Sequence, residues 1–152
     1  MRNQFLVMLL VSTISSYGFP KDPIPRQPKI ESVTHAFKKQ VDPSLITKEF
    51  TFKKLGSIRV LKAVVRVFLY ESIFGESQRV TRRLVFIDGK NKFIGMYGNF
   101  SEMPLSITGN DILFEPDPAY KNEQALIIPH EEIPKEIRFR GEKFQLFGLK
   151  GK

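Results

Sequence analysis

The sequence predicts an all-β domain, an antiparallel meander of about eight strands that forms a small barrel or a sandwich. Two observations predict this fold. After Pro43, apolar and polar residues alternate with a period of two, which is typical of strands. Three glycines also lie between segments whose apolar residues would pair across a hairpin. The alternative is an α+β fold with one or two helices packed on the sheet, at residues 32–41 or 58–72.

The N-terminal residues 1–18 have the features of a signal peptide. Arg2 precedes an apolar run at residues 5–11, and small residues, Ser16 and Gly18, stand at the spacing that signal peptidase requires. Residues 19–30 contain four prolines and predict an extended linker. The remaining residues, 31–152, are expected to form a single β-rich domain. We therefore expect an exported protein, periplasmic or extracellular, with no transmembrane segment in its mature chain.

The first elements of the domain follow from the spacing of its apolar residues. Val33, Phe37 and Val41 recur every four residues, which predicts a short helix over residues 32–41. Phe50 and Phe52 alternate with polar residues, as in a strand. Residues 58–72 fit a strand and also fit a helix, and their four valines favour one continuous strand.

Three hairpins with a glycine at the first central position of the turn would complete the sheet. In the segment DGKN, a turn centred on Gly89 and Lys90 pairs Asp88 with Asn91. Turns centred on Gly109–Asn110 and on Gly141–Glu142 would follow. The predicted cross-strand pairs are Phe86 with Phe93, Val85 with Ile94, Ile107 with Ile112, Leu105 with Phe114, Phe139 with Phe144, and Ile137 with Leu146.

Composition and charge restrict the possible functions. The chain has no cysteine, which excludes disulfides, thiolate metal sites and cysteine nucleophiles. It has 24 basic and 16 acidic residues, a formal net charge of +8. Such a charge favours an acidic protein or an anionic polymer or lipid headgroup as the partner. Nucleic acid is a less favoured partner.

The sequence therefore predicts a non-enzymatic binding module that uses a basic sheet face. Its candidate binding residues fall on two segments expected to be neighbouring strands: Arg59, Lys62, Arg66, Arg79, Arg82 and Arg83. A sheet face rich in arginine and lysine can bind phosphate or carboxylate groups.

Two other functions remain open. The first is a small-ligand carrier, because an eight-stranded barrel can enclose one small molecule. The second is a hydrolase built around His130 with the carboxylates of Glu131, Asp111 and Asp117. No catalytic motif supports it, because Pro134 stands where a zinc-protease helix would have its second histidine. We expect no metal and no cofactor, since Lys90 occupies a ligand position in the DGKN segment and opposes a dication.

Overall fold

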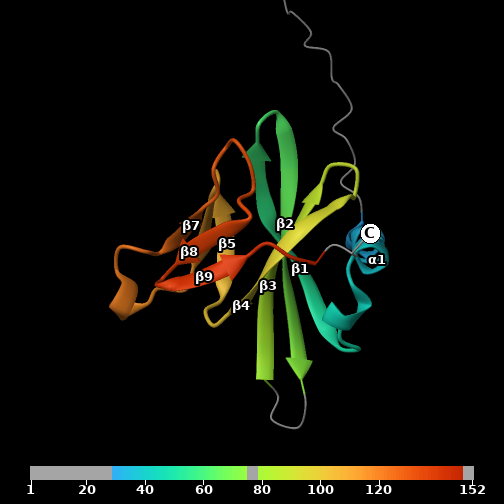
Figure 1. Ribbon diagram of the computed structural model, residues 1–152, viewed down its shortest axis with the longest axis horizontal. Helices are drawn as coiled ribbons and strands as arrows, with labels where there is room; N and C mark the ends of the chain where they lie inside the picture. The colour runs from blue at the N-terminus through green and yellow to red at the C-terminus, as the bar shows by residue number, and fades with distance from the viewer. Residues whose placement is uncertain (1–28, 75–78, 149–152) are drawn as a thin grey trace, which may run out of the picture.

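A computed structural model describes residues 29–74 and 79–148 of the chain, and Figure 1 shows it as three layers. A four-stranded antiparallel sheet lies in the middle, with one α-helix on one face and two smaller sheets on the other. The protein is mostly β, which agrees with the all-β prediction and with its α+β alternative. The predicted signal peptide, and all of the predicted linker before Lys29, lie outside the described residues.

The described residues form the following elements. The helix α1 spans Ile30–Gln40, and short 3₁₀ helices η1 and η2 span Pro43–Leu45 and Pro118–Tyr120. The central sheet has the order β1-β2-β3-β4, with strands Phe50–Val60, Ala63–Phe74, Arg79–Asp88 and Phe93–Phe100. A second sheet joins β5 (Pro104–Thr108), β6 (Asp111–Phe114) and β7 (Ala125–Ile127). A third pairs β8 (Glu136–Phe139) with β9 (Glu142–Gln145).

The helix α1 confirms the helix predicted over residues 32–41. Its buried residues are Val33 and Phe37, and Val41 follows them into the core. Because this apolar stripe recurs once per turn, α1 lies flat on the central sheet. No helix within residues 29–74 and 79–148 is both long and apolar enough to cross a bilayer.

Two apolar cores separate the three layers, because successive side chains of a strand point to opposite faces. The core under α1 contains Val33, Phe37, Val41, Phe68, Tyr70, Val85, Ile87, Phe93 and Met96. The core between the sheets includes Val65, Val67, Leu84, Phe86, Tyr97, Phe100, Ile112, Phe114 and Phe144. These side chains fill the space between the sheets, so the fold gives the carrier alternative no support.

The strand predicted over residues 58–72 is in fact two strands joined by a tight turn. Leu61 and Lys62 form the turn, with Leu61 at a φ of 51°, and Val60 pairs with Ala63. The prediction of one strand was wrong because no glycine, asparagine or proline marks this turn. Val60 stands before it and Val64 after it, so the β-branched pattern runs through the turn without a break.

The hairpin at residues 108–111 confirms its predicted turn. Gly109 has a φ of 62° and Ile107 pairs with Ile112. The predicted pair of Leu105 with Phe114 was wrong, because a bulge places Pro104 opposite Phe114.

The other two predicted hairpins also form, but the turn of each differs from the prediction by one residue, which changes the register. In DGKN the loop is one residue longer than predicted, with Asn91 at a φ of 64°, and it places Ile87 rather than Phe86 opposite Phe93. Asp88 stabilises this loop, because its side chain accepts from the backbone nitrogens of Lys90 and Lys92. A bulge in β4 also pairs Val85 with Met96 instead of the predicted Ile94.

The last hairpin turns one residue earlier than predicted. Arg140 and Gly141 are its central residues, with φ angles of 51° and 78°, as a type I′ turn requires. Ile137 therefore pairs with Phe144 rather than with Leu146, and Phe139 pairs with Glu142. The shift moves the pairing by two residues, so the apolar side chains keep the predicted face.

Candidate functional site

Arg66 is one of the six residues predicted to form a basic face. It is buried on the face of the central sheet against which α1 packs. It is 8 % exposed, and its Nη2 donates to the backbone oxygen of Asp88 and to Oδ1 of Asn91. Burial lowers the pKa of this guanidinium, and the charge of Asp88 opposes the shift. Arg66 thus holds the β3–β4 loop in place and has little surface left for a partner.

Arg83 is buried in the same way further along the sheet. Its Nη1 donates to the backbone oxygen of Leu45 at 2.6 Å. The guanidinium also lies over the rings of Tyr70 and Phe147, 5.6 and 5.8 Å from their centres. Burial lowers its pKa as well. Arg83 fixes the segment between α1 and β1, so its role in this structure is internal.

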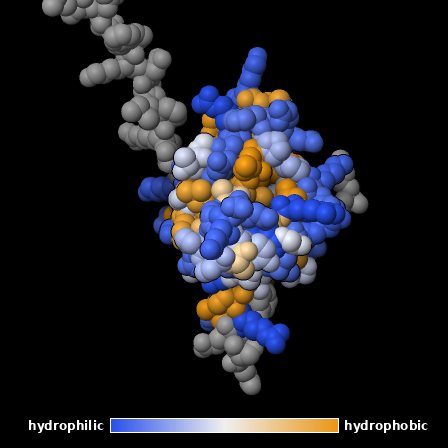
Figure 2. All heavy atoms as spheres, turned by 90° about the vertical axis from the view of Figure 1, so that its left-hand side faces the viewer, coloured by the Kyte–Doolittle hydropathy of each residue, from blue (hydrophilic) through white to orange (hydrophobic). Residues whose placement is uncertain are grey.

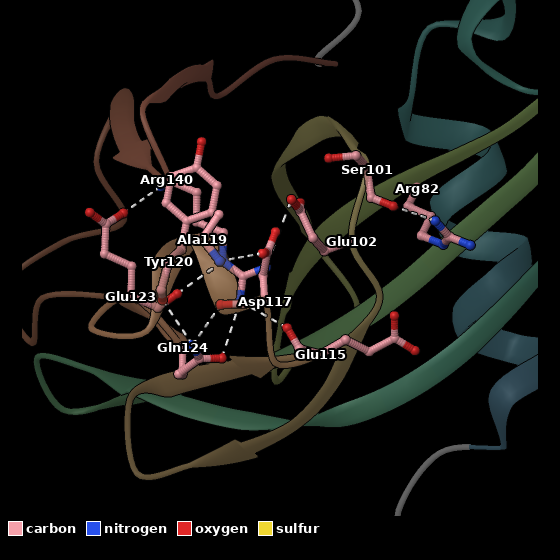
Figure 3. Close-up of polar contacts among 10 residues, drawn as sticks. All are labelled: Arg82, Ser101, Glu102, Glu115, Asp117, Ala119, Tyr120, Glu123, Gln124 and Arg140. Atoms are coloured by element: carbon pink, nitrogen blue, oxygen red, sulfur yellow. Dashed lines mark hydrogen bonds and ion pairs between the residues drawn. The ribbon is translucent and has the colours of Figure 1, made fainter.

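The other four basic residues do not gather on one face. Arg82 lies on the opposite face of the sheet, where its Nε is 3.1 Å from Oε2 of Glu71 and its Nη1 donates to the backbone of Ser101 (Figure 3). Arg59, Lys62 and Arg79 are exposed, but they lie on β1, in the β1–β2 turn and at the start of β3. The structure therefore does not bring the predicted six residues together.

His130 is held by backbone groups rather than by a carboxylate. Its Nδ1 lies 3.2 Å from the backbone oxygen of Arg59, and its own backbone oxygen accepts from Leu61. Asp117 accepts from the nitrogen of Ala119 at the start of η2. Among the described residues no three His, Asp or Glu side chains are placed to hold a metal ion. This arrangement adds no support to the hydrolase alternative.

The acidic loop of residues 115–124 surrounds a buried cation that the chain itself supplies. Arg140 is 3 % exposed and donates to the backbone oxygens of Glu115 and Glu123 at 2.8 and 3.0 Å (Figure 3). Its Nη1 is 3.7 Å from Oε1 of Glu102, and its guanidinium lies 5.9 Å from the ring centre of Tyr120. The guanidinium thus satisfies two backbone oxygens of the loop and balances the nearby carboxylate of Glu102.

Charges are divided unevenly along the chain and between the layers. Residues 29–74 and 79–100, which form α1 and the central sheet, contain fourteen basic and five acidic residues, a formal charge of +9. Residues 101–148, which form the smaller sheets, contain five basic and nine acidic residues, a formal charge of −4. We call these parts the basic half and the acidic half. Figure 2 shows the outer face of the acidic half as mostly hydrophilic, with separate apolar patches.

A groove of about 550 Å³ lies on the basic half, between α1 and the first residues of β1. We call it the α1–β1 groove. It is lined by Ile30, Glu31, Thr34, His35, Lys38, Lys48, Phe50 and Phe52.

Two aromatic side chains form the floor of this groove. Phe52 stacks on Phe37 of α1 at 5.1 Å between ring centres, and Phe50 stacks on Tyr70 of β2 at 4.9 Å. Both rings are half-buried, and each keeps part of its surface open to the groove. Because β1 is an edge strand, the floor borders the open edge of the central sheet.

Lysines stand at the rim of the groove. The Nζ of Lys38 lies 4.8 Å from the ring centre of Phe50, which holds this cation over the aromatic floor. Lys48, which precedes β1, is the second lysine among the lining residues, and Glu31 is the one acidic residue among them. The groove thus offers ammonium groups beside an apolar surface, an arrangement that can bind carboxylates carried on an apolar backbone.

Part of this site was visible in the sequence. The alternation of Phe50 and Phe52 was recognised as a strand, and Lys38 falls in the last turn of the predicted helix. What periodicity could not give is the packing of α1 beside β1, which brings the two segments to one groove. No family model, curated protein or solved structure matches this chain.

Proposed function

We propose that this protein is an exported, non-enzymatic binding module that contacts an acidic protein through the α1–β1 groove. The observation that carries the proposal is the pair of phenylalanine rings, Phe50 and Phe52, with Lys38 held over them on the basic half. A partner carboxylate would meet Lys38 and Lys48 beside an apolar surface. Charge interactions are stronger there than in open water, because fewer water molecules screen them.

The shape of the groove favours a protein over a lipid or an anionic polymer. A concave site with an aromatic floor gains affinity from apolar side chains that enter it, and aromatic residues are enriched in protein interfaces. A flat bilayer surface cannot enter a groove between a helix and a strand. A polysaccharide could satisfy the lysines, but it would leave the phenylalanine rings with few apolar contacts.

The test is a binding titration with a defined acidic peptide across a salt series. The probe is a fluorescein-labelled decapeptide that alternates glutamate and valine, measured by fluorescence anisotropy. The double variant Lys38→Glu/Lys48→Glu should bind at least about tenfold more weakly, because two attractive contacts become repulsive. The control Lys121→Glu/Lys135→Glu makes the same change of net charge on exposed lysines of the acidic half. It should bind within about twofold of the unaltered protein.

Two results would overturn this proposal. Equal losses in both double variants would mean that the peptide responds to net charge and not to the groove. Binding to phosphatidylglycerol vesicles without binding to the peptide would assign the basic half to a lipid surface instead.

A further inference from the structure

We infer that the partner binds as an extended strand, which adds to the edge of β1 at Phe50 and Phe52, beside the α1–β1 groove. This inference rests on the proposed function, because it assigns a binding mode to the same groove. Strand addition needs an edge with unused backbone groups and a place for the side chains of the incoming strand. The N-terminal half of β1 provides both.

The C-terminal half of the β1 edge is closed by the rest of the fold. The backbone nitrogen of Arg59 donates to Oδ1 of Asn110 at 2.9 Å, and its backbone oxygen accepts from Nδ2 of the same side chain at 2.8 Å. The nitrogen of Leu61 donates to the backbone oxygen of His130. These contacts occupy the outward groups of β1 at this end, as native proteins commonly do at sheet edges.

At the N-terminal end of the same edge, the described residues give Phe50 and Phe52 no such cover. Pairing with β2 alternates along β1, and the irregularity between Lys54 and Gly56 reverses which residues face outward. Thr51 and Lys53 therefore bond to β2, whereas the backbone groups of Phe50 and Phe52 point away from the sheet. No hydrogen bond among the described residues reaches those outward groups. An incoming strand would find donors and acceptors ready for pairing.

A groove on each face would receive the side chains of the added strand. The α1–β1 groove lies on the helix side. On the opposite face, a groove of about 270 Å³ is lined by Glu49, Phe50, Thr51, Glu71, Ile73 and Val80. Ile73 and Val80 pair with each other and are 53 % and 44 % exposed. Because side chains alternate along a strand, the matching partner has acidic residues toward Lys38 and apolar residues toward Ile73.

Two other occupants of the edge fit less well. A second copy of this chain, paired antiparallel through β1, would set its basic half, with a formal charge of +9, beside the same half of the first copy, and like charges oppose such pairing. Residues 19–28 of this chain contain four prolines, which cannot donate to a sheet. That segment also has two basic residues and one acidic residue, so its charge has the same sign as the groove.

The test compares three peptides and follows the amide protons of β1 in the full-length protein. The first peptide is the glutamate–valine decapeptide, and the others are N-methylated at every valine or at every glutamate. In a strand, these two methylation patterns block opposite edges of the peptide. We expect one methylated peptide to bind at least about tenfold more weakly and the other to bind like the parent. Hydrogen exchange should slow at Phe50 and Phe52, but not at Thr51 and Lys53.

The outcomes separate this inference from the proposed function. If all three peptides bind alike and the exchange of Phe50 and Phe52 is unchanged, strand addition is wrong while the groove remains an acidic-peptide site. If the parent peptide does not bind at all, the proposed function and the inference fall together. Self-association at the concentrations used, with protection of Phe50 and Phe52 in the absence of peptide, would assign the edge to a second copy.

Discussion

The two halves of the molecule treat their charges differently. In the acidic half, charged residues pair with one another: Arg140 with Glu102, and Lys143 with Glu136. In the basic half, Arg82 pairs with Glu71, but the buried Arg83 bonds to a backbone oxygen and lies over aromatic rings, and no described ion pair involves Lys38 or Lys48. These two pairs of the acidic half satisfy charges within that half, whereas the groove lysines of the basic half remain available to a partner.

The two halves also differ in the contacts that attach an outer element, α1 or the loop of residues 115–124, to the rest of the fold. On the basic half, α1 is attached by apolar packing of Val33 and Phe37. On the acidic half, the loop of residues 115–124 is attached by the polar contacts of Arg140. The difference predicts which substitutions should harm each half, and by how much.

The largest effect is expected for Phe37→Ala on the basic half. Phe37 is 1 % exposed and contacts the rings of Phe52, Tyr70 and Phe93. Losing a buried phenylalanine should lower the free energy of unfolding by about 3–5 kcal/mol, measured by urea denaturation. Phe37→Leu, which keeps most of the buried volume, should cost clearly less. A loss below about 1 kcal/mol for the alanine variant would mean that α1 is held by something other than this packing.

Arg140→Met should have the next largest effect, on the acidic half. The substitution leaves the backbone oxygens of Glu115 and Glu123 without their donors and removes the cation near Glu102. We expect the free energy of unfolding, measured by urea denaturation, to fall by about 2–4 kcal/mol. Amide exchange should speed up in residues 115–124 and stay unchanged in α1. Equal changes in both regions would show that the two surface layers are not attached independently.

Arg83→Met should lower the free energy of unfolding by about 1–2 kcal/mol, which is less than the loss expected for Arg140→Met. The guanidinium of Arg83 has no described carboxylate partner, and its lowered pKa shows that burial disfavours its charge. A methionine would keep the contacts with the rings of Tyr70 and Phe147. The oxygen of Leu45 would keep the hydroxyl of Tyr70 as a partner, at 3.5 Å. Both losses of unfolding free energy are measured in urea. If the loss for Arg83→Met equals or exceeds that for Arg140→Met, the contrast between the halves does not hold.

The fold was predictable where local sequence decides it. The stripe of Val33, Phe37 and Val41 specifies α1, and Gly109 marks its turn because the backbone there needs a positive φ. The turn at Leu61 was missed because leucine seldom occupies a positive φ, so no residue type signals it. The turn also depends on contacts of Arg59 and Leu61 with loops that are far away in the sequence. The spacing of apolar residues gives no information about such contacts.

Of the candidate site, the sequence predicted only the positive charge. The acidic partner that net charge favours stays a prediction, and period-two alternation could not show which arginines would be covered by other elements. Arg66 stands between two valines, as a solvated residue of a half-buried strand would, and Arg83 follows Arg82, yet both are buried beneath other elements. The groove lysines lie on segments that meet only after α1 packs beside β1.

The smallest predicted effect is a pKa change on the surface of the acidic half. The hydrogen bonds of Lys143 and then Gln145 hold the pKa of Glu136 below its ordinary value of 4.5. A depressed carboxyl pKa adds stability above that ordinary value, and the contribution disappears as the pH falls through the lower folded pKa. Lys143→Gln should therefore raise the Glu136 pKa toward 4.5 in an NMR titration, whereas Lys121→Gln should leave it unchanged.

Because Glu136 is fully exposed, Lys143→Gln should not measurably move the urea midpoint at neutral pH. A clear drop in the midpoint would show that surface pairs help to hold the acidic half together. The contrast with the basic half would then extend from the buried Arg140 to the surface. If the urea midpoint is unchanged while the pKa of Glu136 rises, then Arg140 and not the surface pair supplies the stabilising charge of the acidic half. The guanidinium of Arg140 is buried, so water screens its interactions only weakly.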